Sequence, residues 1–383
     1  MRNYYEFFAG GGMVRAGLGE GWHCLFANDF DLKKSRVYRN NWGAGSELKT
    51  TNVSSLKTSD LPGVPNLVWA SFPCQDLSLA GGGAGLKGER SGTFWPFWNL
   101  LTTLVQEGRA PSLIVLENVC GALSSHGGKD FATICKAMVD GGYLVGAVVI
   151  DAVMFVPQSR PRLFVIGVSR DTVLPAALVA NGPLPTWHRT ALLHAYANLS
   201  SPCRDSWIWW NLPGPSTRSM ALSDLIEQNP PDVKWFTETE VERLIGMMST
   251  TNLEKLEKAK RAGVRMIGGV YKRTRRDAHG RRVQRAEIRF DNVSGCLRTP
   301  AGGSSRQVIL VVEGHSVKGR LISTRETARL MGLPDTYQLP ENYNEAYHLT
   351  GDGVVVPVVR YLAEHIFEPI LDCVTVNKST MAA

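Results

Sequence analysis

Short apolar runs rich in β-branched residues recur through residues 1–170, and they restrict the fold of this chain more than any other feature. Stretches with helical spacing separate them. Nearly continuous apolar runs are typical of strands that are buried on both faces of a sheet. The alternation predicts an α/β domain with a mostly parallel, doubly wound sheet. The runs are Tyr4–Ala9, Cys24–Ala27, Leu67–Ser71, Leu113–Leu116, Ala147–Ile150 and Leu163–Val168.

The pattern becomes irregular after residue 170. Pro and Trp are frequent between residues 183 and 215, and an amphipathic helix is predicted near 237–260. A Gly/Ser-rich stretch follows at 301–306. We therefore expect a second, smaller and less regular domain at 171–335.

The C-terminal part regains regular helix signals. Ser323 and Glu326 have the spacing of a capping box, and Gly332 with Pro334 predicts the end of that helix. The apolar segment Val355–Ile370 predicts a further helix. We expect residues 336–383 to complete the first domain.

Positive charge is concentrated in one segment. The chain of 383 residues has a net charge of +7. Residues 255–289 contain thirteen Lys or Arg against Glu257, Asp277 and Glu287, which makes the segment +10. Such a segment favours a polyanionic partner, and the alternative is a solvated basic surface.

The cysteine pattern and hydropathy exclude several classes of protein. The seven cysteines include no CxxC pair, and no Cys/His cluster has zinc-ligand spacing. We see no signal peptide and no apolar run near the roughly 18 residues that a membrane span needs. The sequence predicts a cytoplasmic protein with reduced thiols, no metal and no membrane association.

A glycine-rich turn follows the first predicted strand. Phe8 and Ala9 lead into Gly10, Gly11 and Gly12, before a predicted helix that begins at Met13. Glycines allow a tight turn and a close approach of backbone to a ligand. The second predicted strand ends at Asp29, whose carboxylate can accept hydrogen bonds from both ribose hydroxyls of a nucleoside. The glycines do not form GxGxxG, which favours a nucleoside over a dinucleotide; the alternative is a purely structural turn.

A cysteine follows the third predicted strand. Cys74 comes directly after Phe72 and Pro73, and a glycine-rich loop at 81–92 follows. The carboxyl ends of parallel strands face the ligand crevice, so a thiol there is placed to react. The loop is of the kind that closes over a site. The alternative is a buried and inert cysteine.

Charged side chains flank two more predicted strands. Glu117 ends the strand Leu113–Leu116, and a half-buried Glu beside a base can act as an acid. Arg160 and Arg162 precede the strand Leu163–Val168, and residues two apart on an extended chain point to the same side. They are suited to hold a phosphate or a substrate carbonyl. For Glu117 the alternatives are a helix cap or a salt bridge.

In order, spacing and strand context, these segments together resemble the cytosine-C5 DNA methyltransferase family, of the bacterial or phage modification type. The resemblance covers residues 1–168 and 318–370, and the residues between are where such enzymes differ, because they read the target sequence. The matching segments are Phe8–Gly12, Asn28–Asp31, Pro73–Ser78, Glu117–Val119, Gln158–Arg162, Thr324–Asp335 and Gly351–Pro357.

The resemblance implies a covalent mechanism with four catalytic residues. Cys74 would attack C6 of a cytosine flipped out of the duplex, which turns C5 into a nucleophile. Glu117 would protonate or hydrogen-bond N3 and the exocyclic amine. Arg162 would contact O2 of the base, and Arg160 would support the thiolate or a nearby phosphate.

The resemblance also implies S-adenosyl-L-methionine as methyl donor, leaving S-adenosyl-L-homocysteine. Asn52 stands where the family usually has Asp, Asp352 where it has Asn, and Cys296-Leu297 where Thr-Leu is common. The expected cofactor contacts are Phe8, Gly10, Gly11, Gly12, Asp29, Phe30, Asn52, Pro73, Phe94 and Asp352.

Double-stranded DNA is the expected partner, bound by a monomer that works beside a possible cognate restriction endonuclease, in the cytoplasm of a bacterial cell or a phage-infected host. We expect the basic segment to contact phosphates and residues 302–306 to approach base edges. The expected DNA contacts are Gln75, Ser78, Arg275, Arg276, Gly302, Gly303 and Arg306.

Three other functions are weighed against this one. An RNA cytosine methyltransferase of the same fold typically has Cys-Phe-Thr near the nucleophile, and this sequence has no such tripeptide there. A non-catalytic nucleic-acid-binding module would not need Cys74, Glu117, Arg160 and Arg162. A nucleotide-dependent oxidoreductase does not fit the glycine pattern or the Cys/Glu pair.

Overall fold

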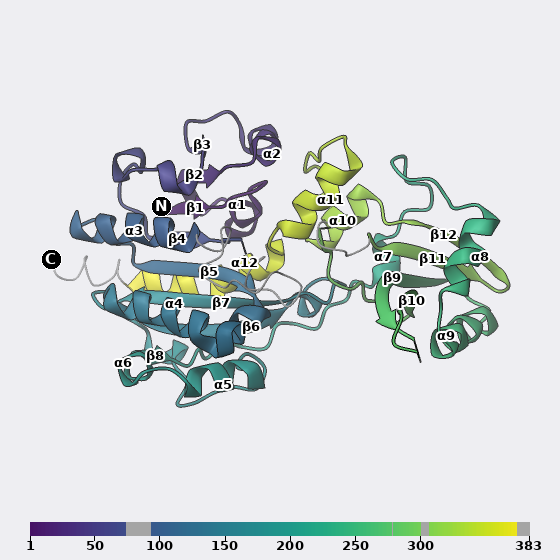
Figure 1. Ribbon diagram of the computed structural model, residues 1–383. Helices are drawn as coiled ribbons and strands as arrows, with labels where there is room; N and C mark the ends of the chain where they lie inside the picture. The colour runs from purple at the N-terminus through teal and green to yellow at the C-terminus, as the bar shows by residue number, and fades with distance from the viewer. Residues whose placement is uncertain (74–92, 278, 300–305, 374–383) are drawn as a thin grey trace. The chain divides into compact units, whose positions relative to one another are not determined.

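The computed structural model describes residues 1–73, 93–277, 279–299 and 306–373. The chain divides into two compact units (Figure 1). The first comprises Met1–Asp151, Pro161–Ser216 and Val356–Ala383, and the second comprises Ala152–Arg160 and Thr217–Val355.

The first unit is built on an eight-stranded sheet in the order β3-β2-β1-β4-β5-β7-β6-β8. The strands from β3 to β5 are mutually parallel, whereas β7 runs antiparallel to both of its neighbours. This confirms the predicted mostly parallel sheet. The strands are β1 Arg2–Phe7, β2 Trp22–Asp29, β3 Leu48–Thr50, β4 Leu67–Ala70, β5 Leu113–Val119, β6 Tyr143–Asp151, β7 Pro161–Ser169 and β8 Trp207–Ile208.

Helices cover both faces of this sheet, as expected of a doubly wound fold (Figure 1). On one face, α3 and α4 pack into a single apolar core with β1, where Phe97 meets Phe7 at a ring separation of 5.0 Å. On the other face, Phe367 lies 6.3 Å from Trp69, between ring centroids. The helices are α1 Met13–Leu18, α2 Leu32–Trp42, α3 Phe94–Gln106, α4 Lys129–Asp140, α5 Thr190–Ala197, α6 Ser201–Asp205 and α12 Val356–Leu362, which continues as a π turn at Ala363–Phe367.

The division of the chain differs from the domains predicted from the sequence. Residues 171–216 belong to the first unit because β8 pairs with β6, and because the N–H of Val149 on β6 donates to the carbonyl of Trp187 at 2.8 Å. Residues 336–355 belong to the second unit, where α11 packs on α10. The irregular composition after residue 170 therefore does not mark the boundary.

The second unit is built on an antiparallel four-stranded sheet in the order β10-β9-β11-β12. Two helices, α8 and α9, occupy the region predicted as one helix, and the capping box at Ser323–Glu326 begins α10 as predicted. The elements are α7 Leu222–Leu225, α8 Glu238–Gly246, α9 Thr250–Arg261, β9 Met266–Arg276, β10 Arg282–Arg289, β11 Val308–Glu313, β12 Ser316–Leu321, α10 Thr324–Leu330 and α11 Tyr343–Asp352.

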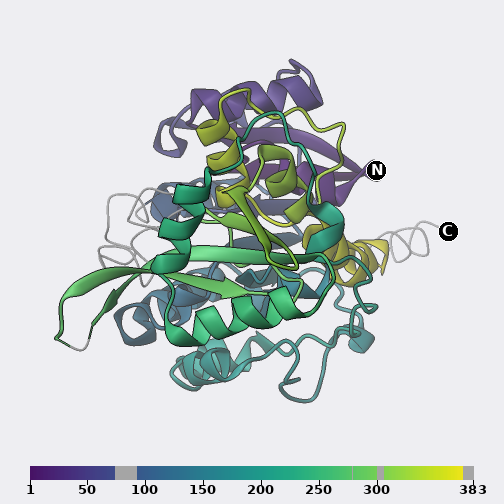
Figure 2. The ribbon, with the colours of Figure 1, turned by 90° about the vertical axis from the view of Figure 1, so that its right-hand side faces the viewer.

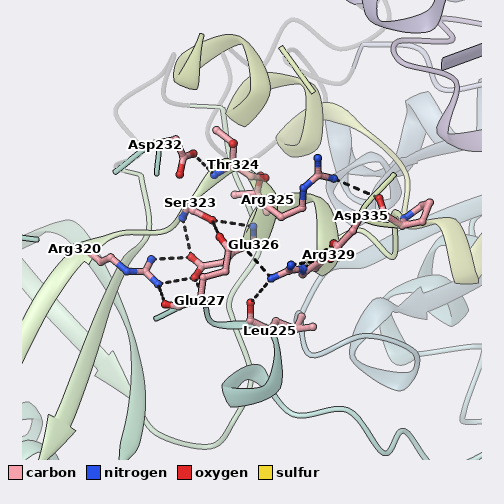
Figure 3. Close-up of polar contacts among 12 residues, drawn as sticks. Leu225, Glu227, Asp232, Arg320, Ser323, Thr324, Arg325, Glu326, Arg329 and Asp335 are labelled. Atoms are coloured by element: carbon pink, nitrogen blue, oxygen red, sulfur yellow. Dashed lines mark hydrogen bonds and ion pairs between the residues drawn. The ribbon is translucent and has the colours of Figure 1, made fainter. Parts of the chain in front are cut away.

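A fully buried ion pair joins elements of the second unit (Figure 3). Both side chains of the Arg320–Glu326 pair have 0% exposure, and Arg320 also donates to the carbonyl of Glu227 at 2.7 Å. Glu326 further accepts from the backbone N–H groups of Glu227 and Ser323, each at 2.7 Å. The pair thus connects β12, the start of α10 and the segment after α7.

Candidate active site

One edge of the large sheet collects most of the predicted catalytic and cofactor residues that the structure describes. The carboxyl ends of β1, β2, β4 and β5 lie at the same edge because these strands are parallel. Since β7 is antiparallel, its first residues lie at this edge too, and Arg162 pairs with Val119 in the register. The glycine turn, Asp29, the segment that leads into Cys74, Glu117 and Arg162 therefore come from the same edge.

The glycine turn is held by the carboxylate of Asp29. One oxygen accepts from the N–H of Gly10 and the other from the N–H of Asp31, each at 2.8 Å. Burial raises the pKa of the Asp29 carboxyl above its ordinary value. Phe8 has a φ of 59°, which is unusual for a bulky residue and is typical of strained backbone at functional sites. Asp29 therefore orders the turn in addition to its predicted role.

Trp42, at the end of α2, braces the same turn. Its indole nitrogen donates to the carbonyl of Gly11 at 3.0 Å, and the guanidinium of Arg15 stacks 5.2 Å from the ring centroid. Gly12 has a φ of 77°, and a Cβ there would lie 2.3 Å from the indole nitrogen. Arg15 is itself held by Tyr38 at 2.9 Å and Glu47 at 2.8 Å. The sequence pattern predicted a role for neither Trp42 nor Arg15, because both lie outside the glycine-rich segment Phe8–Gly12.

The surroundings of the turn fit a nucleoside. The ring of Phe30 is 66% exposed beside Asp29, and a Cβ on Gly10 would meet no atom within 4 Å. Asn52 lies after β3, where its side-chain oxygen accepts from the N–H and hydroxyl of Ser54. An exposed aromatic face, a carboxylate and an open stretch of backbone are the groups that bind an adenine, a ribose and a polar tail.

Phe94, one of the predicted cofactor contacts, lies in the apolar core. Its exposure is 0%, and its ring packs on Phe72 and Trp98 in the apolar core. Phe94 therefore supports Phe72, which comes just before the segment that leads into Cys74. Pro73 is half-buried and directly follows Phe72.

Glu117 and Arg162 form an ion pair at the end of β5. The Nε of Arg162 lies 3.2 Å from a carboxylate oxygen of Glu117, and their side chains are 15% and 8% exposed. The neighbouring Asn118 donates to the carbonyl of Phe72 at 3.2 Å and accepts from the N–H of Val119. Asn118 thus holds the backbone two residues before Cys74, a positioning role that its place in the Glu-Asn-Val motif did not by itself predict.

Arg160 and Arg162 have different partners, although the sequence predicts that they point to the same side. Arg160 belongs to the second unit and is 2% exposed. It donates to Cys296 Sγ and Leu297 O at 3.3 and 3.0 Å, and to Gly351 O and Gly353 O at 2.8 and 2.7 Å. These contacts give Arg160 a positioning role, because they connect the segment Cys296-Leu297 to the C-terminal end of α11 within its own unit.

Asp352 is the last residue of α11, and its carboxylate accepts a hydrogen bond from the hydroxyl of Thr299. Gln158 completes the arrangement. Its side chain donates to Leu330 O at 2.8 Å and accepts from Leu297 N at 3.1 Å. The segment Gln158–Arg160 therefore anchors the chain at Leu297 and the C-terminal end of α11.

The predicted DNA contacts that the structure describes lie in the second unit. Arg275 and Arg276 are neighbours on β9, so their side chains point to opposite faces of the strand. Arg306 stacks on Tyr343 and donates to Asn344.

Five predicted residues lie outside the described residues, namely Cys74, Gln75, Ser78, Gly302 and Gly303. Within the part of the chain that is described, no three His, Cys, Asp or Glu side chains gather as metal ligands. No helix in the same part has the length and apolar character to cross a membrane.

Comparison with solved structures supports the fold. A methyltransferase from Entamoeba histolytica, EhMeth, has a TM-score of 0.63 with 15% identity over 96% of this chain and 98% of that one. A putative DNA modification methyltransferase encoded within an E. coli prophage has a TM-score of 0.57 with 15% identity over 97% and 100% of the two chains.

Comparison with curated proteins gives relatives along nearly the whole chain. The type II methyltransferase M.Bsp6I of Bacillus sp. (strain RFL6) is 24% identical over 96% of this chain and 98% of its own length. The type II methyltransferase M.HhaI of Haemophilus parahaemolyticus is 24% identical over 95% and 93%. The model of the family described as C-5 cytosine-specific DNA methylase matches residues 3–368. The chain therefore belongs to the C-5 cytosine-specific DNA methylase family and is an enzyme of that class.

Proposed function

We propose that this enzyme flips a cytosine out of duplex DNA and methylates its C5 with Cys74 as covalent nucleophile. The observation that carries the proposal is the Arg162–Glu117 pair, 3.2 Å apart, beside the backbone that Asn118 holds before Cys74. A carboxyl and a guanidinium side by side match the N3, amine and O2 edge of cytosine. Cys74 follows the carboxyl end of β4 in the sequence, and we propose that its thiol acts at the same edge.

The proposed chemistry begins with the addition of the Cys74 thiolate to C6. The π electrons of the C5–C6 bond move toward N3, where Glu117 supplies or shares a proton, and C5 becomes an enamine carbon. Arg162 donates to O2 and stabilises the charge that develops on the ring. C5 would then take the methyl group from the bound donor and become tetrahedral, and loss of its proton to solvent would re-form the C5–C6 double bond and expel the Cys74 thiolate. The base must leave the stack first, because C6 is not reachable inside a duplex.

S-adenosyl-L-methionine, the donor used by the family, would supply the methyl group as an electrophilic sulfonium substituent. We propose that Asp29 accepts from the ribose hydroxyls with its remaining lone pairs and that Phe30 packs on the adenine. The strained turn from Phe8 to Gly12 would face the polar end of the donor. Asp29→Ala should weaken donor binding by about 1.5–3 kcal/mol, the range for hydrogen bonds to a charged group, as measured by calorimetry.

Covalent trapping tests the proposal. DNA that carries 5-fluorocytosine should form a stable adduct with the wild-type enzyme, because fluorine cannot leave as a cation. Cys74→Ala should form no adduct and retain duplex binding, and Cys296→Ala should still be trapped. An adduct that survives in Cys74→Ala, or methyl transfer to RNA with none to DNA, would contradict the proposal.

The biological role proposed for this activity is protection of DNA. The relatives above are named type II methyltransferases, and we propose that this enzyme modifies sites that a cognate endonuclease would cut. Bisulfite sequencing of a plasmid carried with the gene should show methylated cytosines within one recurring short sequence. Methylation without any shared sequence would contradict a modification role.

A further inference from the structure

The strands β9 and β10 continue as a two-stranded ribbon beyond the rest of the small sheet. β11 pairs with β9 only over Met266–Val270, whereas Tyr271–Arg276 pair with β10 alone. Figure 2 shows this part of the ribbon extending past the neighbouring strands. A two-stranded ribbon is marginally stable in water by itself, and several DNA-binding proteins insert or lay such ribbons on DNA.

The register of the ribbon divides its side chains into two faces. Residues directly opposite each other on antiparallel strands share a face. Arg273 faces Arg285, and Arg276 faces Arg282. Because side chains alternate along a strand, these two pairs lie on opposite faces. We name them the open face, which also carries Tyr271, Arg275 and Glu287, and the back face, which also carries Lys272 and Thr274.

Helix α9 covers the base of the back face. Val270, Ala286 and Ile288 are on that face and are buried in one apolar cluster with Leu256 and Ala259 of α9. The open face has different neighbours. A Cβ on Gly269, which shares the open face, would lie 3.1 Å from the side chain of Gln307, and the hydroxyl of Tyr271 donates to Gln307 at 2.6 Å.

A basic pocket of about 250 Å³ lies beside β10, where the base of the open face meets α9. Tyr271, Arg273, Glu287 and Arg289 line it from the open face, and Asn252 and Lys255 of α9, Ile288 and Gly295 complete the lining. The carboxylate of Glu287 holds two arginines side by side, with Nε distances of 3.3 Å to Arg273 and 2.6 Å to Arg275. Because Glu287 already fixes the guanidinium groups, an anion that binds to them costs less side-chain entropy.

Charge alone does not choose between the faces, since each carries a cross-strand pair of arginines. The pocket favours the open face, because its Arg273 and Arg289 lie on that face. A concave basic surface takes a phosphate with more than one donor. On the back face, the guanidinium of Arg276 instead donates to Gly280 O at 3.1 Å, within its own turn.

We propose that the open face lies against the sugar–phosphate backbone of duplex DNA, with one phosphate in the pocket beside Lys255, Arg273 and Arg289, and that the back face points away from DNA. The proposal rests on the proposed function for its partner. It also separates Arg275, on the open face, from Arg276, although the sequence predicted phosphate contacts for both.

Two double variants with the same charge change test this assignment. Arg273→Gln/Arg285→Gln removes the arginine pair of the open face, and Arg276→Gln/Arg282→Gln removes the pair of the back face. Duplex affinity is measured by fluorescence anisotropy between about 50 and 200 mM salt. Each lost phosphate contact should flatten the slope of log K against log salt by about 0.9, so the open-face variant should lose close to two such contacts. The back-face variant should keep the wild-type slope.

Equal slopes in the two variants, or a larger loss in the back-face variant, would overturn the assignment. Lys255→Gln provides a second measurement at an exposed position, and it should flatten the salt slope by the equivalent of about one phosphate contact. An unchanged slope would show that no phosphate binds in the pocket. If the wild type neither binds duplex DNA nor methylates it, the proposed function fails. If the wild type does both and the variants are alike, only the ribbon assignment fails.

Discussion

The indole nitrogen of Trp42 donates to the backbone carbonyl of Gly11 at 3.0 Å, so a side chain from the end of α2 holds the turn that follows β1. Trp42→Phe keeps an aromatic ring beside Gly12 and removes the donor. The loss of one hydrogen bond is worth about 1 kcal/mol, so S-adenosylmethionine binding should weaken about fivefold. KM for the donor should rise while kcat at saturation stays near the wild-type value.

Trp187→Phe is the matched control for this change. Trp187 also donates its indole N–H to a backbone carbonyl, that of Leu212, at 2.9 Å, but it lies outside the turn. Calorimetry should find wild-type donor affinity in Trp187→Phe. If Trp42→Phe binds the donor as tightly as the wild type, the hydrogen bond from Trp42 to Gly11 does not contribute to donor binding.

Arg160 should matter for the stability of the second unit as well as for activity. Lys at this position has a single nitrogen and cannot serve four acceptors, so buried carbonyls near Leu297 and Gly351 would lose their donors. Each unsatisfied buried group costs about 1–3 kcal/mol. Urea unfolding of Arg160→Lys should therefore show a loss of about 3 kcal/mol.

Arg162→Lys is the comparison for Arg160→Lys, because Arg162 lies at the site edge and pairs with Glu117. It should reduce methylation at least tenfold with a smaller change in unfolding free energy, since a lysine lacks the planar fork that holds a carboxylate and a base together. Equal stability losses in the two variants would remove the distinction between a positioning role and a catalytic one.

Removal of Arg320 alone should destabilise the protein more than removal of both members of the buried Arg320–Glu326 pair (Figure 3). Arg320→Met leaves the Glu326 carboxylate buried without its cation, which typically costs 3–5 kcal/mol. Arg320→Met/Glu326→Leu removes both charges and should recover part of that loss. Lys136→Met, which breaks an exposed pair with Asp140, should cost less than about 1 kcal/mol. Thermal unfolding of the three variants checks the order.

Glu6 should make stability depend on pH. Burial on β1 raises the pKa of its carboxyl to about 8, against the opposing effect of Arg15. Between pH 4.5 and 8 the unfolded chain ionises this group while the folded chain keeps its proton. The contribution of Glu6 to the free energy of unfolding is therefore full at low pH, falls through this window and is flat above it. Glu6→Gln should flatten the pH dependence of the free energy of unfolding, as measured by denaturant titrations from pH 5 to 9. The same pH dependence in the variant and the wild type would contradict the raised pKa of Glu6.

The sequence by itself determined the features that depend on local periodicity. Buried apolar runs predict β1, β2, β4, β5 and β7, and the rule that ligands meet the carboxyl ends of parallel strands places Gly10, Asp29 and Glu117 at one edge. The capping box at Ser323 is equally local, since it needs only residues within one helical turn.

Only the tertiary structure decided which side chains meet across long sequence separations. Arg160 and Arg162 are two residues apart, yet the chain passes from one compact unit to the other between them, and they bind different partners. Arg162 reaches Glu117 because β7 runs antiparallel to β5, and no local pattern specifies that direction. The brace by Trp42 and the burial of Phe94 likewise depend on how helices pack on the sheet. Periodicity encodes which face of an element is apolar, whereas the partner of that face is chosen by close packing of the whole unit.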